Sequence, residues 1–291
     1  PLTPGESVRL TTSVGGLASS SLQGSDREWR GELVSPFVDR LKNSLENFIV
    51  QRGSGKTIIA GYPWFLDWGR DTLIVARGML AAGLVEEVRD LVLTYAALEE
   101  NGTLPNSLRG GDASNRDTSD APLWFGVVCG ELAATGVDLN QLRAGERSVS
   151  EVLQSIATHY RDGTPNGIRM DAASGLIWSP THFTWMDTNH PAGSPREGYP
   201  VEIQALWLQL LRQLGGEWEA IREQAEASFQ SLFKIENDWL ADQLIAKPNV
   251  AAAEATPDNA LRSNGLLAVA LGEVTGEPAR RMVVAAQRHL V

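Results

Sequence analysis

The chain has 291 residues, of which 43% are hydrophobic and 21% are charged. This composition is typical of a soluble globular protein, and the length allows one large domain or two ordinary ones. Acidic residues outnumber basic ones, which leaves a formal net charge of −11. Because phosphate binding needs a basic face, we expect no nucleic-acid partner. No apolar run approaches the roughly 20 residues that a transmembrane helix needs, so we expect no membrane partner either.

The single cysteine, Cys129, lies in the apolar run LWFGVVCGELAA. One cysteine excludes an intrachain disulfide, and we interpret it as a buried thiol in a reducing, cytoplasmic compartment. At the start of the chain, residues 1–25 are mostly polar and small, which is typical of a linker or of the tail of a preceding domain. We therefore expect one folded unit at residues 26–291.

This unit is predicted to consist of helices joined by long polar loops. In SPFVDRLKNSLENFIV the apolar residues recur three to four positions apart, which is the period of an amphipathic helix. The predicted helices are Glu32–Val50, Asp71–Ala82, Val85–Glu99, Ala121–Ala134, Val149–His159, Val201–Leu214, Trp218–Phe233, Ala260–Leu271 and Pro278–His289. Short strands are predicted at Thr57–Ala60 and Ile168–Ile177, as a hairpin within a loop. Paired antiparallel helices with functional residues in their connections favour an all-α fold, an α/α toroid.

The run GSGKT at Gly53–Thr57 resembles the end of a phosphate-binding loop. The complete pattern needs a glycine at position 50, where the chain has Val50. Gly61 and Pro63 also interrupt the helix that should follow, so no helix N-terminus is available to hold a phosphate. The sequence therefore does not predict nucleotide binding.

Aromatic and charged side chains gather in GYPWFLDWGRDT, just before a predicted helix. The candidate binding residues of this run are Trp64, Asp67, Trp68, Arg70 and Asp71. Aromatic faces beside carboxylates and a guanidinium suit a sugar ring, which offers C–H faces for stacking and hydroxyls for charged partners.

Three further loops or helix starts combine tryptophan with carboxylates. Their candidate residues are Asn106, Asp120 and Trp124 in the first, Trp185 and Asp187 in the second, and Arg196, Glu202 and Trp207 in the third. Such pairings in four separate segments are hard to explain by stability alone. They favour a single sugar site built from distant parts of the chain.

Each of these residues also has a structural explanation. Asp71 and Asp120 precede predicted helices and could be N-caps, a role compatible with ligand binding. Asp67 and Arg70 could form a local surface salt bridge worth about 0–1 kcal/mol. Glu202 could lie in the first turn of its helix, where negative charge is favourable.

Asp187 is harder to explain by stability. Its neighbours Trp185, Met186 and His190 suggest an apolar setting, which would raise the pKa of a carboxyl group as a general acid requires. The spacing of His182 and His190 matches no common metal pattern, so we expect no metal and no cofactor. The chain has no GxSxG motif and no polar surroundings for its cysteine, so carboxylates remain for acid–base work on a glycosidic bond.

A series of motifs resembles the amylo-α-1,6-glucosidase domain of glycogen debranching enzymes. The motifs are AGYPWFLDWGRDT, LPN followed by NRDTSDAPLWF, FTWMD, GYPVEIQALW and LRSNGLLAVAL. They occur in the family's order and at about its spacing, from roughly Arg30 to the C-terminus. The resemblance implies an (α/α)6 toroid of glucoamylase-like type that hydrolyses α-1,6-linked glucose at the branch stubs of glycogen or another α-glucan, with inversion.

The resemblance also implies roles for individual residues. Arg70 and Asp71 would hold the hydroxyls of the terminal glucose between the walls Trp64 and Trp68. Asn106 and Asp120 would line the same pocket.

The general acid would come from a loop other than the one that carries Arg70 and Asp71. Asp187 is the preferred general acid and Asp120 the alternative, while Glu202 would orient the substrate at the pocket edge.

An (α/α)6 toroid has twelve helices, whereas nine are predicted here. In the family, a segment beyond the LRSN motif contributes the catalytic base. We expect a further C-terminal segment or a partner chain to complete the toroid, and residues 26–291 to turn sugar over poorly without it. Two alternatives stay open: a non-catalytic glycan-binding fragment, and another toroidal α-glucosidase such as a trehalase.

Overall fold

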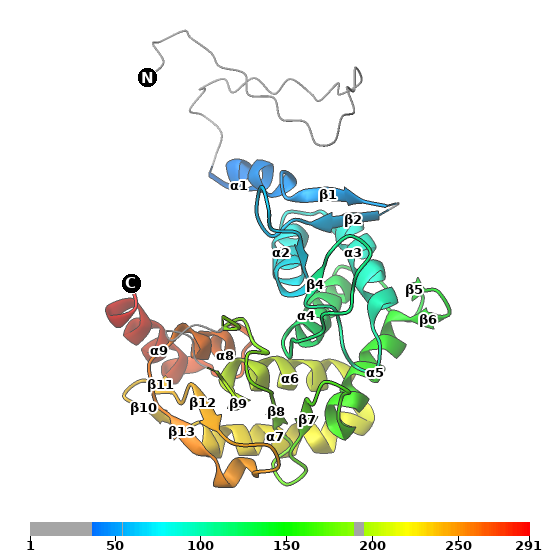
Figure 1. The fold of residues 1–291 in the computed structure, drawn as a ribbon. Coiled ribbons are helices and arrows are strands. Elements are labelled where there is room, and N and C mark those ends of the chain that lie inside the picture. Colours follow the sequence, from blue (N-terminus) through cyan, green and yellow to red (C-terminus); the bar gives the residue numbers. More distant parts are fainter. Residues whose placement is uncertain (1–36, 54, 189–194) are drawn as a thin grey trace, which may run out of the picture. The chain divides into compact units, whose positions relative to one another are not determined.

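The computed structural model describes residues 37–53, 55–188 and 195–291 (Figure 1). Contacts divide the chain into the units Pro1–Arg40 and Leu41–Val291, and nearly all described residues belong to the second. The expected boundary after residue 25 lies outside the described residues. No helix among the described residues is long and apolar enough to cross a membrane.

Helices dominate the structure, as predicted. The described residues form nine α-helices: α1 (Phe37–Glu46), α2 (Gly69–Ala81), α3 (Val85–Leu98), α4 (Ala121–Ala134), α5 (Val149–Asp162), α6 (Val201–Leu214), α7 (Glu219–Leu232), α8 (Leu266–Ala270) and α9 (Gly276–His289). Three short 3-10 helices add to them, at Gly216–Trp218, Ala252–Glu254 and Ser263–Gly265.

Short antiparallel strands occupy the connections between the helices. The two-stranded pairs are β1 (Ile49–Arg52) with β2 (Gly55–Ile58), β3 (Asp67–Trp68) with β4 (Ser107–Leu108), β5 (Arg143–Ala144) with β6 (Arg147–Ser148), β7 (Arg169–Met170) with β8 (Ile177–Trp178), and β10 (Ile235–Glu236) with β11 (Trp239–Leu240). One three-stranded sheet has the order β13 (Thr256–Asp258), β12 (Gln243–Ile245), β9 (Gly198–Pro200).

Two helices, α4 and α6, lie at the centre of the core. Each buries ten of its 14 residues, and a helix that is apolar on most faces must be enclosed by other elements. Figure 1 shows α4 between α2 and α6, and the contacts pair α2 with α4, α4 with α6 and α6 with α7. Trp207 of α6 stacks on Tyr160 and meets the edge of Trp218, so this candidate residue belongs to the core.

This packing places three helix starts together. The N-terminal ends of α2, α4 and α6 carry Arg70, Asp120 and Glu202, and these three side chains line one cavity. Gly69 allows the loop before β4 to approach α2, because a Cβ at this position would lie 2.4 Å from the carbonyl oxygen of Pro105. The fold therefore gathers at one place the polar residues that the sequence distributes over separate segments.

The first predicted helix, Glu32–Val50, is too long at its C-terminal end. The described helix ends at Glu46, and Ile49–Arg52 form β1 instead, paired with Gly55–Ile58. The pairing aligns the β-branched Ile49 with Ile58, which favours extended backbone. Within the GSGKT run, Gly53 lies in a turn with a φ of 56° and Gly55–Thr57 lie in β2. The predicted strand at Thr57–Ala60 thus begins two residues earlier.

The segment Ala260–Leu271 is helical over only part of its predicted length. It begins as the 3-10 helix Ser263–Gly265 and continues as the α-helix Leu266–Ala270. Arg262 forms an ion pair with Asp258 of β13 at 2.9 Å, which holds the preceding residues against the sheet. By contrast, the hairpin predicted within Ile168–Ile177 is confirmed by β7 and β8.

Candidate active site

Arg70 lies at the centre of the site. Its Nε donates to Asp120 Oδ2 at 2.6 Å, and its NH1 donates to Asp187 Oδ2 at 3.3 Å. Burial by itself would lower the pKa of Arg70, but the charges of Asp120 and Asp187 outweigh it and raise the pKa. The buried NH2 nitrogen has no hydrogen-bond partner among the described residues, which is unusual for a buried donor.

Asp120 is held at both carboxylate oxygens. Thr118 Oγ1 donates to Oδ1 at 2.7 Å, while Arg70 occupies Oδ2. Asp120 takes the N-cap position of α4 but makes no side-chain cap bond; the amide of Ala121 donates to Thr118 Oγ1 instead. The capping explanation for this carboxylate is therefore wrong: the carboxylate binds Arg70 and Thr118 instead of the helix N-terminus.

Asp187 reaches Arg70 from an irregular loop, 117 residues further along the chain. Its side chain is 31% exposed and lies beside a guanidinium, so the expectation of an apolar setting for this carboxylate is wrong. His190, one of the neighbours on which that expectation rested, lies outside the described residues. Asp187 is much more open to solvent than Asp120, whose side chain is 2% exposed.

Asp71 follows Arg70 in the first turn of α2, so it is not the N-cap, which is Trp68. Burial raises the pKa of Asp71, and although Arg70 opposes this, the charges of Asp120 and Asp187 add to it. Three carboxylates thus share the neighbourhood of one guanidinium. Among carboxylates this close, the pKa of at least one is expected to rise.

Two cavities meet at Arg70. The smaller, of about 330 Å³, contains Asp120, Trp124 and Glu202 together with residues of α8. The larger, of about 600 Å³, contains Asp71 and many aliphatic side chains. Both are lined by Arg70, Ile74 and Trp185; these lining residues form the boundary between them.

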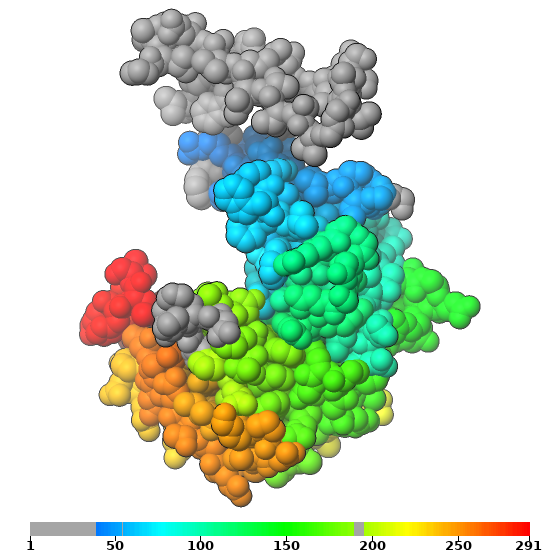
Figure 2. Space-filling view, viewed as in Figure 1, coloured from blue at the N-terminus to red at the C-terminus, as the bar shows by residue number. Residues whose placement is uncertain are grey.

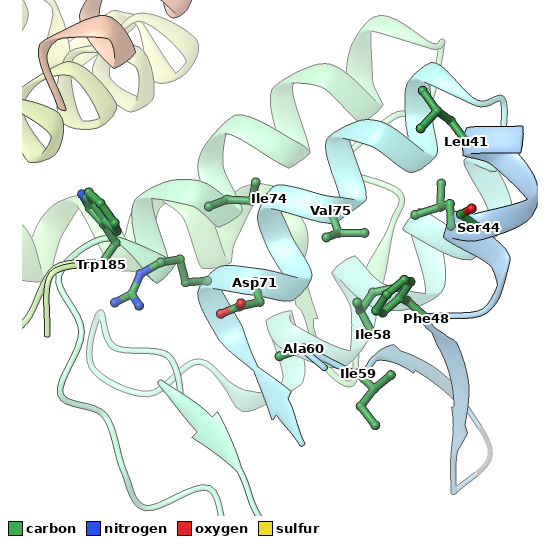
Figure 3. Close-up of a pocket in the computed structure, with 12 residues that line it drawn as sticks. Leu41, Ser44, Phe48, Ile58, Ile59, Ala60, Asp71, Ile74, Val75 and Trp185 are labelled. Carbon is green, nitrogen blue, oxygen red and sulfur yellow. The ribbon is translucent and has the colours of Figure 1, made fainter. Parts of the chain in front are cut away.

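Figure 3 shows the larger cavity with Trp185 at one end, Asp71 near its middle, and Phe48 and Leu41 at the other end. In Figure 2 the surface is hollowed between the cyan region that holds α2 and the red region that holds α9. The smaller cavity is lined by residues of both α2 and α8, and the indoles of Trp124 and Trp185 form part of its wall.

A buried ionic cluster adjoins the smaller cavity through Glu202, which lines it. Arg196 donates to both oxygens of Glu202, at 2.8 Å through Nε, and also contacts the Asp242 carboxylate. Burial raises the pKa of Glu202, while Arg196 opposes the rise. Arg262 reaches the same Asp242 oxygen at 2.7 Å, and Asn264 donates to the other oxygen at 2.8 Å.

Asp242, Arg262 and Asn264 were not among the predicted site residues. Arg262 and Asn264 lie in the LRSN motif, which carries the resemblance but no assigned role. Asp242 has no such signal, because it stands alone in WLADQL beside a short strand. Only the folded chain shows that it joins two arginines.

Several predicted residues lie away from the two cavities. Asp67 is buried and pairs with Arg52 at 2.6 Å, so the proposed local salt bridge with Arg70 is wrong. Trp64 is 75% exposed, Trp68 is half-buried, and Asn106 is buried with its Oδ1 unpaired. None of these four lines either cavity.

The structure thus brings together Arg70, Asp71, Asp120 and Asp187 as the sequence predicts, with Trp124, Trp185 and Glu202 in the walls. Among the described residues, no group of three His, Cys, Asp or Glu side chains could hold a metal ion. His182 is half-buried, with a φ of 61°. Cys129 is buried in α4, and burial raises the pKa of its thiol.

The fold and the site define the class of protein: an all-α fold of the (α/α)6 toroid, glucoamylase-like type, of which the described residues form nine helices, with a carboxylate–guanidinium pocket. The chain belongs to the amylo-α-1,6-glucosidase family, whose model matches residues 43–291. It is therefore a member of a family of glycoside hydrolases.

Solved structures from Thermus thermophilus share the fold. Two are of a GH63 mannosylglycerate hydrolase: the complex with Tris is 14% identical and the complex with glucose 16% identical. A third is of an uncharacterized conserved protein at 14% identity. Each match has a TM-score of 0.62 and covers 87% of this chain and 76–77% of the other. At such low identity the likeness shows the fold alone.

Proposed function

We propose that the protein hydrolyses α-1,6-linked glucose at the branch stubs of glycogen or a related α-glucan, by an inverting acid–base mechanism. The observation that carries the proposal is Arg70, which lines a cavity together with Trp124 and Trp185 and pairs with both Asp120 and Asp187. Membership of the amylo-α-1,6-glucosidase family supports the reaction class. A GH63 mannosylglycerate hydrolase of the same fold has been solved in complex with glucose, which is consistent with a sugar as the ligand.

In this proposal the terminal glucose lies against the indole walls and Arg70. The guanidinium of Arg70 donates to a sugar hydroxyl, and the carboxylate of Asp71 accepts from another, because both side chains line the larger cavity. Charge-assisted hydrogen bonds of this kind are stronger than neutral ones and fix the ring's orientation. Asp67 and Trp68 lie directly before α2, and the main-chain oxygen of Asn106 accepts from the amide of Gly69 at 2.9 Å, so these residues support the backbone that carries Arg70.

The proposal assigns the general acid to Asp187. Each oxygen of Asp120 already accepts a hydrogen bond, and each oxygen of Glu202 accepts one from Arg196. Adding a proton to either carboxylate would break one of those bonds. Asp187 pairs with Arg70 through one oxygen and retains 31% exposure, so it is better placed to give a proton to the leaving oxygen.

An inverting site also needs a second carboxylate, roughly 6.5–9.5 Å from the acid, to activate water. The resemblance implies that a segment beyond the LRSN motif supplies it. We propose that such a segment, or a partner chain, completes the site. The full-length protein is therefore the form to assay.

The test is a comparison of substrates and product anomers. We expect the full-length protein to release glucose from panose and isomaltose-type α-1,6 glucosides, with β-glucose as the first product by NMR. Cleavage of trehalose or of mannosylglycerate in preference to α-1,6 glucosides would overturn the proposed specificity. Binding of maltooligosaccharides without any glucose release would instead indicate a glycan-binding protein.

The acid is tested by Asp187→Asn, with Asp117→Asn as the control. Asp117 is exposed and lies three residues before Asp120. General acid catalysis contributes about 10²–10⁴-fold, so Asp187→Asn should lower kcat by about that factor while Asp117→Asn should leave it unchanged. A loss of less than about tenfold for Asp187→Asn would remove Asp187 from this role.

A further inference from the structure

Trp185 is exposed for 51% of its surface, yet its indole is tethered. Its Nε1 donates to Oδ1 of Asn264 at 2.8 Å, 79 residues further along the chain. The same ring lines both cavities beside Arg70. A half-exposed ring that could rotate freely would not keep the two cavities separate. Because this hydrogen bond fixes the ring, it determines where the boundary between the cavities lies.

Asn264 can hold the indole only if its amide has one orientation. Its side chain is buried, and its Nδ2 donates to Asp242 Oδ1 at 2.8 Å and lies 3.6 Å from the Sδ of Met186. An ionised carboxylate accepts hydrogen bonds and donates none. Asp242 therefore requires the NH2 group of Asn264 to face it, which leaves the amide oxygen facing Trp185.

Asp242 is itself fixed. It is buried, and its carboxylate contacts Arg196 and Arg262, the latter at 2.7 Å. The main-chain oxygen of Asp242 also accepts from Arg196 NH2 at 3.0 Å. A buried network of this kind, with its members paired, holds a single arrangement.

The tether acts on the loop that carries Asp187. Trp185 is bound to Asn264 and Asp187 is bound to Arg70, with one residue between them. The loop is thus attached at two points that both line the smaller cavity, at Asn264 just before α8 and at Arg70 on α2.

We propose that Asn264, oriented by Asp242, is a positioning residue that holds Trp185 as the partition between the two cavities. The partition sets the depth of the space open to the terminal sugar, while the pair with Arg70 holds Asp187 on the same loop in place. This inference deepens the proposed function, because it takes the cavity at Arg70 as the sugar site.

The first test removes the donor and keeps an aromatic face. Trp185→Phe should raise KM for panose by about two- to tenfold, the range that loss of one hydrogen bond allows, with a much smaller change in kcat. Trp239→Phe is the matched control, because Trp239 also donates its indole N–H, at 2.9 Å to the main-chain oxygen of Asn259. The control should leave KM unchanged.

A double-mutant cycle tests the coupling. Asn264→Ala should raise KM by a similar factor, and in that background Trp185→Phe should add little, because both changes break the same bond. If the double variant raises KM by the product of the two single factors, the two residues act independently and the proposal is overturned. If Asn264→Ala does not fold, Asn264→Ser keeps a small polar group, and its cycle with Trp185→Phe decides in the same way.

A second readout does not depend on turnover. In protein labelled with ¹⁵N at tryptophan, the indole proton that disappears in Trp185→Phe should exchange slowly with water, and Asn264→Ser should speed its exchange. Exchange as fast as that of a free indole in the unaltered protein would overturn the tether. If no glucoside is hydrolysed, the proposed function fails, whereas this exchange measurement and glucose binding still decide the role of Asn264.

Discussion

Removal of the charge at Arg70 is the most direct test of the site, and we consider the variant Arg70→Met. The Arg70 and Asp120 side chains are 9% and 2% exposed, and their ion pair measures 2.6 Å. Without the guanidinium, the buried Asp120 carboxylate keeps only Thr118 as a side-chain hydrogen-bond partner among the described residues. Loss of one partner from such a buried pair costs about 3–5 kcal/mol.

The size of the effect can be compared with that at an exposed pair. Arg280 and Glu277 form an ion pair at 2.6 Å with side chains 65% and 59% exposed, and pairs in such a setting contribute little because water screens them. For a chain of this length, 1 kcal/mol shifts Tm by about 2–4 °C. Arg70→Met should therefore lower Tm by roughly 6–20 °C, whereas Arg280→Met should leave it nearly unchanged.

Thermal unfolding followed by circular dichroism measures both shifts, with Asp120→Asn and the double variant completing a cycle. Because the two residues share one interaction, the double variant should cost about 0.5–3 kcal/mol less than the sum of the single changes. If Arg70→Met does not fold, Arg70→Lys keeps the charge and should give a smaller loss. A shift no larger than that of Arg280→Met, or strict additivity, would refute the buried pair.

Two further predictions concern the same end of α2. The raised pKa of Asp71, caused first by burial, means that its contribution to stability is present in acid and is lost as pH rises through the folded-state pKa. Asp71→Asn should therefore raise Tm at neutral pH and match the unaltered protein in acid, while lowering glucose release; equal Tm curves across pH would contradict this. Gly69→Ala should cost about 1–3 kcal/mol, since its Cβ would meet the carbonyl of Pro105 at 2.4 Å. Gly78→Ala on the same helix, with nothing within 4 Å, should be stabilising by about 0.4–1 kcal/mol in urea unfolding.

Much of the helical framework could be predicted from the sequence, because apolar periodicity is a local signal. Val85–Leu98, Ala121–Ala134 and Val201–Leu214 each lie within one residue of prediction. The failures are at segments whose structure depends on a partner outside the segment itself, even where that partner is close in the sequence. β1 needs β2 to pair with, and the residues before α8 follow the strand that Arg262 contacts.

The same distinction applies to the site. The motifs correctly gather Arg70, Asp120 and Asp187, but spacing alone pairs Asp67 with Arg70, whereas the fold gives Asp67 to Arg52. No local pattern identifies Asp242, because its role comes from two arginines brought to it by tertiary packing. Residue types in loops indicate the chemistry, and only packing assigns the partners.

The sequence separations at Arg70 have a consequence for how the protein acquires its activity. Its partners lie 50 and 117 residues away, and contacts between such distant residues form late because long loops must close first. A nascent chain that has emerged only as far as α4 would hold the guanidinium and one of its two acidic partners. We expect glucose release to be the last property regained on refolding, after helicity, which makes it a strict measure of completed folding.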